Sequence, residues 1–287
     1  MPTTYAHWRF GEHVIKTLPQ NLQNTVNKYR SLFGYGVHGP DIFFYYNCLK
    51  KDNYYSYGSE LHHYSMHRFA DIFKKAYHNS DNKPAILSYM LGFLAHFTLD
   101  SVAHSYIQCK ADLEGPSHNK IESQYDRHLM ILDGRDPIKF KAYKTLKSTK
   151  FNAHIIAQCF DRFDDETMYK IIDAQRFYLS LLKDTNDLKR WFLTTAMTAL
   201  HVNSFLDLMT TKVNEPSCIA SNERLDKYFA VAEKGYRKLA DSFMDFLLND
   251  KPLDPYFENN FEERDDYRSI PLLDPISEKD YVVDFEI

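Results

Sequence analysis

Residues 92–126, GFLAHFTLDSVAHSYIQCKADLEGPSHNKIESQYD, decide the fold of this chain. The first part of this stretch is apolar on nearly every side of a helix, which predicts a buried helix. Within it, His96, Asp100 and His104 recur every four residues. Because positions i and i+4 lie on one face of an α-helix, the three side chains point to the same side. An unpaired buried carboxylate is very costly, so the pattern predicts a metal ion beside Asp100.

His118 and Glu122 repeat the four-residue spacing after a short Gly-Pro-Ser break. They form a second pair of candidate ligands on the next predicted helix. On a helix that rises about 1.5 Å per residue, His96 and His104 stand roughly 12 Å apart, and both cannot reach one ion through bonds of about 2 Å. Asp100 lies midway and could bridge ions on either side. The spacing therefore predicts a multinuclear site.

Further ligands must come from elsewhere in the chain, because zinc takes three or four ligands per ion. His104 is a candidate partner of His118 and Glu122. His7, on the first predicted helix, remains for a third ion beside Asp100. The candidates to complete the ion at His96 and Asp100 are Asp41 and one of His62, His63 and His67. Among common metals, zinc suits this histidine-rich, thiol-free set best, with manganese and iron as alternatives.

The composition of the chain favours an almost wholly helical protein. Its 287 residues include only 9 glycines, and apolar residues recur in many i, i+3, i+4 sets. With 44% hydrophobic residues the chain can bury a substantial core. We predict an all-α fold, a compact multi-helix bundle with the metal cluster between its helices.

Charge and cysteine usage narrow the possible partners and the compartment. The 35 Lys and Arg residues against 39 Asp and Glu residues give a net charge of −4. The chain therefore has no excess of positive charge that would indicate binding to nucleic acid. The four cysteines are widely spaced, which fits free thiols. The first twenty residues lack the apolar region of a signal peptide, and no run of about 18 apolar residues predicts a transmembrane segment. These features predict a cytoplasmic location; the oligomeric state stays open.

Helical periodicity and turn residues divide the chain. The pattern predicts helices over residues 3–16, 19–33, 58–77, 84–108, 138–146, 152–163, 165–183, 187–213 and 222–248. It also predicts a helix that carries His118, Glu122 and Asp126, before a turn at residues 133–137. It predicts a non-helical loop at residues 34–41 and a tyrosine-rich loop at residues 53–57. We expect one all-α metal-binding domain at residues 1–250, with the site residues within 1–135, and an irregular C-terminal extension at residues 251–287.

The pattern HxxxDxxxH followed by HxxxE, preceded by an early histidine, a Pro-Asp dipeptide and a GxxLH element, resembles the bacterial zinc-dependent phospholipase C family. The resemblance spans roughly residues 5–126. It implies a compact all-α bundle, related also to fungal zinc-dependent single-strand nucleases. It also implies hydrolysis of a phosphodiester bond in a phospholipid or a related substrate.

The resemblance also implies a ligand set. One zinc would be held by Asp41, His62, His96 and Asp100, a second by His104, His118 and Glu122, and a third by His7, Asp100 and the chain's N-terminus. The resemblance makes Asp41 the general base as well. His62 is preferred to His63 because GSELH matches the GxxLH element. We expect two to three zinc ions per chain.

Two departures from the family pattern affect what can be carried over. Secreted members ligate the third zinc through a mature N-terminal tryptophan, whereas this chain begins MPTTYA. The aromatic residue that follows the base in the choline pocket is Ile42 here. The resemblance therefore defines neither the third site nor the lipid head group. The neighbouring aromatic run of Phe43, Phe44 and Tyr45, together with Tyr64, could hold a lipid or base moiety or simply pack in the core.

The mechanism predicted from these residues is hydrolysis by a metal-activated water, which Asp41 orients or deprotonates. Asp126 continues the HxxxE spacing, and we expect it to hydrogen-bond a ligand histidine. One alternative is a nuclease or nucleotidase on the same zinc platform. A second is a non-hydrolytic di-iron bundle, although di-iron sites use paired Glu and ExxH elements rather than HxxxD and HxxxE.

Overall fold

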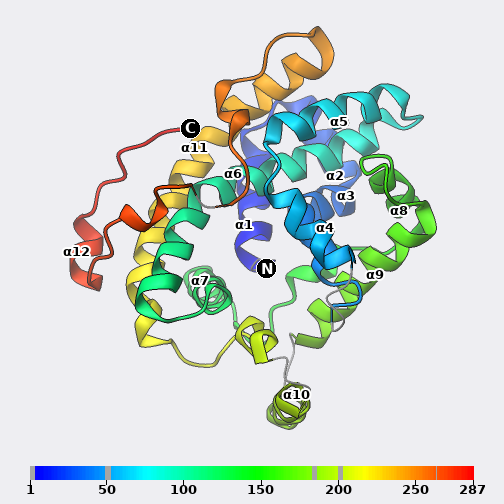
Figure 1. Cartoon of the computed structure of the whole chain (residues 1–287). Coiled ribbons are helices and arrows are strands. Elements are labelled where there is room, and N and C mark those ends of the chain that lie inside the picture. The colour runs from blue at the N-terminus through cyan, green and yellow to red at the C-terminus, as the bar shows by residue number, and fades with distance from the viewer. Residues whose placement is uncertain (1–3, 49–52, 183–185, 200–202, 263) are drawn as a thin grey trace.

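In the computed structural model, which describes residues 4–48, 53–182, 186–199, 203–262 and 264–287, all regular secondary structure is helical. The all-α prediction is confirmed for this part of the chain (Figure 1). The α-helices are α1 (Thr4–Val14), α2 (Gln20–Lys28), α3 (Arg30–Gly36), α4 (Asn53–His62), α5 (Met66–Asn79), α6 (Lys83–Glu114), α7 (His118–Leu132), α8 (Lys150–Ala157), α9 (Asp165–Leu182), α10 (Asp187–Ala199), α11 (Ile219–Asn249) and α12 (Pro275–Asp280). Short 3₁₀ helices include η2 (Gly39–Phe44), η4 (Asn203–Leu208) and η6 (Pro255–Glu258).

Helix α6 is the centre of the fold, and the helices α1, α3, α5, α7 and α11 pack around it (Figure 1). The side chain of Asn82 caps its first turn by accepting from the amide of Ala85, and Gly115, with φ of 96°, ends it. By length and composition alone α6 could cross a membrane, but 94% of its most apolar window is buried inside the protein. The burial is that of a core helix, as the sequence predicted.

Helices α3 and α6 approach each other closely through two glycines. A Cβ atom on Gly36 would lie 2.2 Å from the carbonyl oxygen of Tyr89, and one on Gly92 would lie 2.3 Å from that of Phe33. No side chain fits at either position, so the backbones themselves are in contact. This close crossing places η2, which follows α3, against the ligand face of α6.

Several helix boundaries differ from the sequence prediction. The helix predicted at residues 19–33 breaks at Tyr29, and its second half continues as α3 into the predicted loop at 34–41. The predicted loop at 53–57 is the start of α4. The helix predicted at 58–77 breaks at Ser65, whose side chain accepts from the amide of Arg68 and caps α5. Packing of α3 against α6 and of α4 against η2, and the cap at Ser65, outweigh intrinsic propensity at these boundaries.

The second half of the chain also departs from prediction in places. Residues 138–146 contain only a short 3₁₀ helix (Ala142–Thr145), and the helix predicted at 187–213 ends at Ala199. Helix α10 projects from the body (Figure 1). Its residue Leu193 packs with Leu182 and Met209 in a small second apolar cluster, separate from the main core.

The C-terminal extension after α11 contains only short helices, and it is firmly packed. Phe257 and Phe261 are fully buried in the main core. Arg224 of α11 makes a bidentate ion pair with Glu278 of α12, and both side chains are fully buried. The division into a domain at residues 1–250 and an extension at 251–287 stays a prediction.

Candidate metal centre

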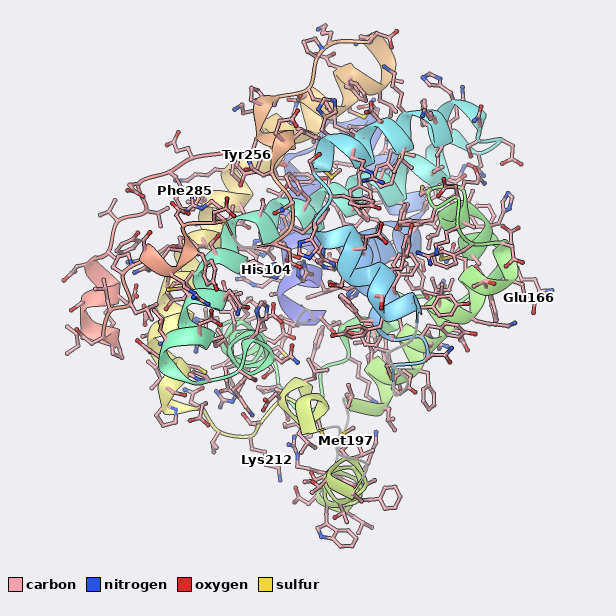
Figure 2. All side chains as sticks on the ribbon, in the orientation of Figure 1. His104, Glu166, Met197, Lys212, Tyr256 and Phe285 are labelled. Atoms are coloured by element: carbon pink, nitrogen blue, oxygen red, sulfur yellow. The ribbon has the colours of Figure 1, made fainter. Side chains whose placement is uncertain are left out.

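Five elements bring the predicted ligands together around α6. His96, Asp100 and His104 lie on one face of this helix, as their spacing predicted. Asp41 comes from η2, and His62 is the last residue of α4. The other predicted ligands are His118 and Glu122 of α7 and His7 of α1. In Figure 2, His104 lies near the middle of the molecule, whereas Glu166 and Lys212 lie near its edge.

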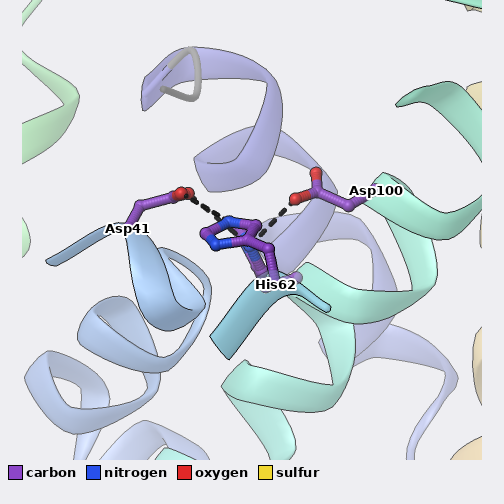
Figure 3. A group of neighbouring side chains, drawn as sticks. Asp41, His62 and Asp100 are labelled. Carbon is purple, nitrogen blue, oxygen red and sulfur yellow. Dashed lines mark hydrogen bonds and ion pairs between the residues drawn. The ribbon is translucent and has the colours of Figure 1, made fainter. Parts of the chain in front are cut away.

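The first group consists of Asp41, His62, His96 and Asp100. All four residues are buried, and each offers one ligand atom within 4.8 Å of the others. Nε2 of His62 lies 3.0 Å from Oδ1 of Asp41, and Nε2 of His96 lies 2.9 Å from Oδ2 of Asp100. In the view of Figure 3, Asp41 and Asp100 lie on either side of His62. Two carboxylates and two imidazoles thus converge on one volume.

The second group consists of His104, His118 and Glu122, whose ligand atoms also lie within 4.8 Å of one another. Oε1 of Glu122 lies 3.2 Å from Nε2 of His118 and 3.6 Å from Nε2 of His104. The same nitrogen of His104 lies 3.7 Å from Oδ2 of Asp100. Asp100 therefore reaches toward both groups, in the bridging position that the helix spacing predicted.

His7 belongs to neither group but lies beside them. Its Nε2 atom is 3.1 Å from Oδ1 of Asp100, and its ring stacks on that of His96 with centroids 4.5 Å apart. A void of about 30 Å³ is lined by His7, Asp100, His104 and Glu122 together with apolar side chains. This is enough room for one ion or one water. The N-terminus, predicted as a further ligand of the third ion, lies outside the described residues.

The hydrogen bonds of four histidines leave their Nε2 atoms facing the carboxylates. Nδ1 of His62 bonds to the carbonyl of Gly58 at 2.7 Å, and that of His96 to the carbonyl of Val37 at 3.3 Å. Nδ1 of His104 bonds to the carbonyl of Phe261, and that of His118 to Oε1 of Gln108 at 3.1 Å. Because these oxygens only accept, Nδ1 carries the proton. A neutral ring then presents a lone pair at Nε2, the arrangement typical of metal-binding histidines.

The groups contain orphaned polar atoms that fit a cation. Oδ2 of Asp41, Oδ2 of Asp100, Oε2 of Glu122 and Nε2 of His96 are buried without a hydrogen-bond partner among the described residues. Nε2 of His96 and Oδ2 of Asp100 lie close but lack hydrogen-bond geometry. An unsatisfied buried carboxylate oxygen is costly. The nitrogen and oxygen donors match the ligand types that zinc uses.

The electrostatics of the centre lead to the same conclusion. Burial opposes ionisation of Asp100, but His104, His96 and His7 outweigh it and hold the pKa of this carboxyl well below its usual range. Burial also opposes protonation of His104, yet the carboxylates of Asp100 and Glu122 raise the pKa of its imidazole to about 10. The carboxylates therefore stay ionised, and the site attracts positive charge, carried by protons or by metal ions.

The structure also places the other residues that the sequence analysis named. His62 is buried, whereas His63 is exposed. Both oxygens of Asp126 accept backbone amides of α1, those of Tyr5 at 2.9 Å and Ala6 at 2.7 Å. Asp126 therefore anchors the helix of His7, and a hydrogen bond between Asp126 and a ligand histidine stays a prediction. The aromatic run Phe43, Phe44 and Tyr45 is buried and packs in the core.

Two positions that shape the centre escaped the sequence prediction. Gly39 has φ of 50°, and a Cβ atom there would lie 2.2 Å from the ring of His96. The Gly-Pro-Asp triplet that contains it is the only local signal. His38 is buried nearby; burial and the neighbouring His7 lower the pKa of its imidazole to about 3. No spacing rule could have found it.

Comparisons with known proteins agree with this geometry. The family model described as "Zinc dependent phospholipase C" matches residues 6–173. All eight predicted ligands, from His7 to Glu122, lie within this range. The match extends beyond residue 126, where the motifs of the sequence end. No curated protein and no solved structure matches the chain.

Proposed function

Since this chain belongs to the zinc-dependent phospholipase C family, we propose that it hydrolyses a phosphodiester bond of a phospholipid or a related molecule. The observation that carries this proposal is the pair of buried ligand groups that meet at Asp100. We propose that Asp41, His62, His96 and Asp100 hold one zinc ion and that His104, His118 and Glu122 hold a second. His7 and Asp100 would contribute to a third.

Zinc at this centre would polarise the phosphodiester as a Lewis acid and make a water reactive near neutral pH. The chain's own residues supply the geometry. The hydrogen bonds at Nδ1 hold each of the four imidazoles in one orientation. The shared carboxylate of Asp100 sets the distance between the two groups, a requirement for acting together on one phosphate.

Asp41 is the proposed general base. Burial disfavours its ionised form, but His96 and His62 outweigh this effect and lower the pKa of the carboxyl. One oxygen is engaged by His62 at 3.0 Å, and the other, Oδ2, has no hydrogen-bond partner among the described residues. We propose that this second oxygen accepts a proton from the attacking water or orients it.

The direction of approach follows from exposure. The side chain of His118 is 26% exposed, whereas those of His104 and Asp100 are 11% and 4% exposed. We propose that substrate enters on the His118 side and that Asp41, deeper in the protein, receives the proton away from bulk solvent. A cytoplasmic location stays a prediction.

One experiment tests this function directly. Protein purified without chelator is analysed for metals and then incubated with phospholipid vesicles of single head groups, a chromogenic phosphodiester and single-stranded DNA. We expect two to three zinc ions per chain and release of a phosphorylated head group that chelator abolishes and added zinc restores. Hydrolysis of DNA alone would favour the nuclease alternative. A zinc-loaded protein that cleaves none of these substrates would overturn the proposal.

A further inference from the structure

The segment that follows η6, residues 259–262, crosses the metal centre although it lies far outside the range matched by the family model. Hydrogen bonds fix its first residue and the chain just after it. The carbonyl of Asn259 accepts from the amide of Met66 at 2.9 Å, at the start of α5. The amide of Arg264 donates to Oγ of Ser105 on α6 at 3.0 Å. The segment therefore has a defined path between α4, α5 and α6.

Phe261, in the middle of this segment, bonds to one residue of each ligand group. Its amide donates to the carbonyl of His62 at 3.1 Å, where α4 ends. Its carbonyl accepts from Nδ1 of His104. His62 belongs to the first group and His104 to the second. The backbone of one residue thus connects the two groups. At His104 it bonds to the ring nitrogen opposite to Nε2, the atom that faces Asp100 and Glu122.

The ring of Phe261 packs directly on two ligand imidazoles. It is fully buried, with its centroid 5.9 Å from that of His62 and 5.7 Å from that of His96. Its other ring neighbours are the core residues Phe69, Phe93 and Phe97, at 5.6, 5.6 and 5.3 Å. The ring therefore anchors the segment in the core and forms an apolar wall behind the first ligand group.

We propose that Phe261 is a positioning residue of the zinc centre. Its carbonyl holds the proton of His104 on Nδ1, so that Nε2 is free to face Asp100 and Glu122. Its amide and ring hold His62 and His96 at the first group. The C-terminal extension is then part of the machinery that binds zinc. This inference rests on the metal centre proposed above and adds a residue that the family match does not contain.

The expected size of the effect comes from other metal sites. Partners that orient a metal-binding histidine typically contribute about 10- to 100-fold to metal affinity. Removing the ring leaves the backbone groups of residue 261 in place but releases the segment that carries them. We therefore expect Phe261→Ala to weaken zinc binding within that range, and Phe261→Leu, which refills most of the space, to restore much of it.

Phe257 provides the matched control. It lies four residues earlier in the same extension, is also fully buried, and packs on Phe97 with centroids 6.3 Å apart. None of its described ring contacts involves a predicted ligand. Phe257→Ala therefore removes the same side chain from the same core without disturbing an imidazole. It should lower the Tm of the metal-free protein to a similar extent as Phe261→Ala.

The test measures zinc affinity of the full-length chain by competition with a chromophoric chelator, together with Tm in excess EDTA. We expect Phe261→Ala to lose about 10- to 100-fold in affinity and Phe257→Ala less than about threefold. In NMR spectra of the zinc-loaded protein, the Nδ1–H resonance of His104 should be lost or shifted in Phe261→Ala only. If Phe261→Ala does not fold, Phe261→Leu is compared with Phe257→Leu, and the loss of zinc affinity should again be larger in the Phe261 variant.

Equal losses of affinity in the Phe257 and Phe261 variants would overturn the inference, because the role of Phe261 would then be packing alone. An unchanged affinity in Phe261→Ala would also overturn it. Neither result bears on catalysis, since affinity is measured without substrate. Conversely, a wild-type protein that binds zinc and cleaves no phosphodiester would overturn the proposed function and leave the role of Phe261 intact.

Discussion

Nε2 of His7 lies 3.1 Å from Oδ1 of Asp100, so the first helix of the chain is joined to the ligand face of the central helix. The other oxygen of Asp100 faces His96 at 2.9 Å and His104 at 3.7 Å. One carboxylate is therefore shared by three imidazoles from two helices. Because an aspartate has only two oxygens, this sharing is the strongest constraint on how the metal centre can be assembled.

Replacement of Asp100 tests that constraint. Asp100→Asn keeps the size of the side chain but removes the anion that the three histidines face. We expect the zinc content to fall by at least one ion per chain and phosphodiester hydrolysis to fall by more than about 100-fold, beyond the loss typical of a ligand's outer partner. Metal analysis and initial rates measure both. The control is Asp112→Asn on the same helix, whose exposed carboxylate bonds to Tyr267 and Arg268. Wild-type zinc content and rate in Asp100→Asn would contradict the assignment.

Zinc should stabilise the fold, because it neutralises carboxylates that are otherwise buried together. Binding to the native state alone adds about 2.7 kcal/mol per site when free zinc is 100-fold above its Kd. Calorimetry should therefore show a Tm that falls in EDTA and recovers with zinc. Magnesium, which prefers oxygen ligands, should not restore it. Identical Tm values with and without zinc would argue against a buried metal centre.

Asp126 anchors the helix that carries His7. Its two oxygens accept the amides of Tyr5 and Ala6, so Asp126→Ala should cost about 1–2 kcal/mol of stability, as loss of an N-terminal cap does. The ion expected at His7 should be lost before the others. Denaturant unfolding and metal analysis measure the two effects.

The control for Asp126 is Asp274, which caps α12 by accepting from Ile276 and Ser277. Asp274→Ala removes the same kind of cap at a helix that carries none of the predicted ligands. It should leave the zinc content unchanged. A zinc content that stays the same in Asp126→Ala would show that α1 does not need this anchor to hold a metal.

Asp133 bonds to Tyr5 and Arg9 of α1, and its ionisation should make the stability of the fold depend on pH. Burial raises the pKa of this carboxyl, but its bonds to Arg9 at 2.9 Å and to the hydroxyl of Tyr5 at 2.6 Å outweigh burial and lower it. A pKa depressed in the folded state contributes stability above the unfolded value of about 3.9, and this is lost as pH falls through the folded value.

Asp133→Asn should therefore cost about 1–2 kcal/mol at pH 7, because it removes hydrogen bonds to a charged carboxylate. The gap between the unfolding free energies of wild type and variant should narrow as pH falls below about 4. Urea unfolding between pH 3 and pH 7 measures this gap. A gap of constant size over that range would show that the ionisation of Asp133 does not stabilise the fold.

The local sequence pattern was sufficient to predict features that depend only on neighbouring residues. The four-residue spacing of His96, Asp100 and His104 places them on one helix face whatever surrounds them, and the structure shows that face. The apolar surroundings of these residues predicted a buried helix, and α6 is buried. The break at Tyr29 and the helical start of α4 were missed, because they depend on packing between elements rather than on the propensity of either segment.

The sequence by itself determined the fold class and the identity of the central helix and predicted the ligand types, because helix periodicity and metal chemistry are properties of residues a few positions apart. The burial of His62 beside the exposed His63 agrees with the preference drawn from the GxxLH element. Only the tertiary structure showed which residues of distant segments lie together at the candidate centre. The stacking of His7 on His96 and the hydrogen bonds of Phe261 with His62 and His104 join residues distant in the chain. Such contacts arise from the simultaneous burial of several helices, and no local pattern encodes them.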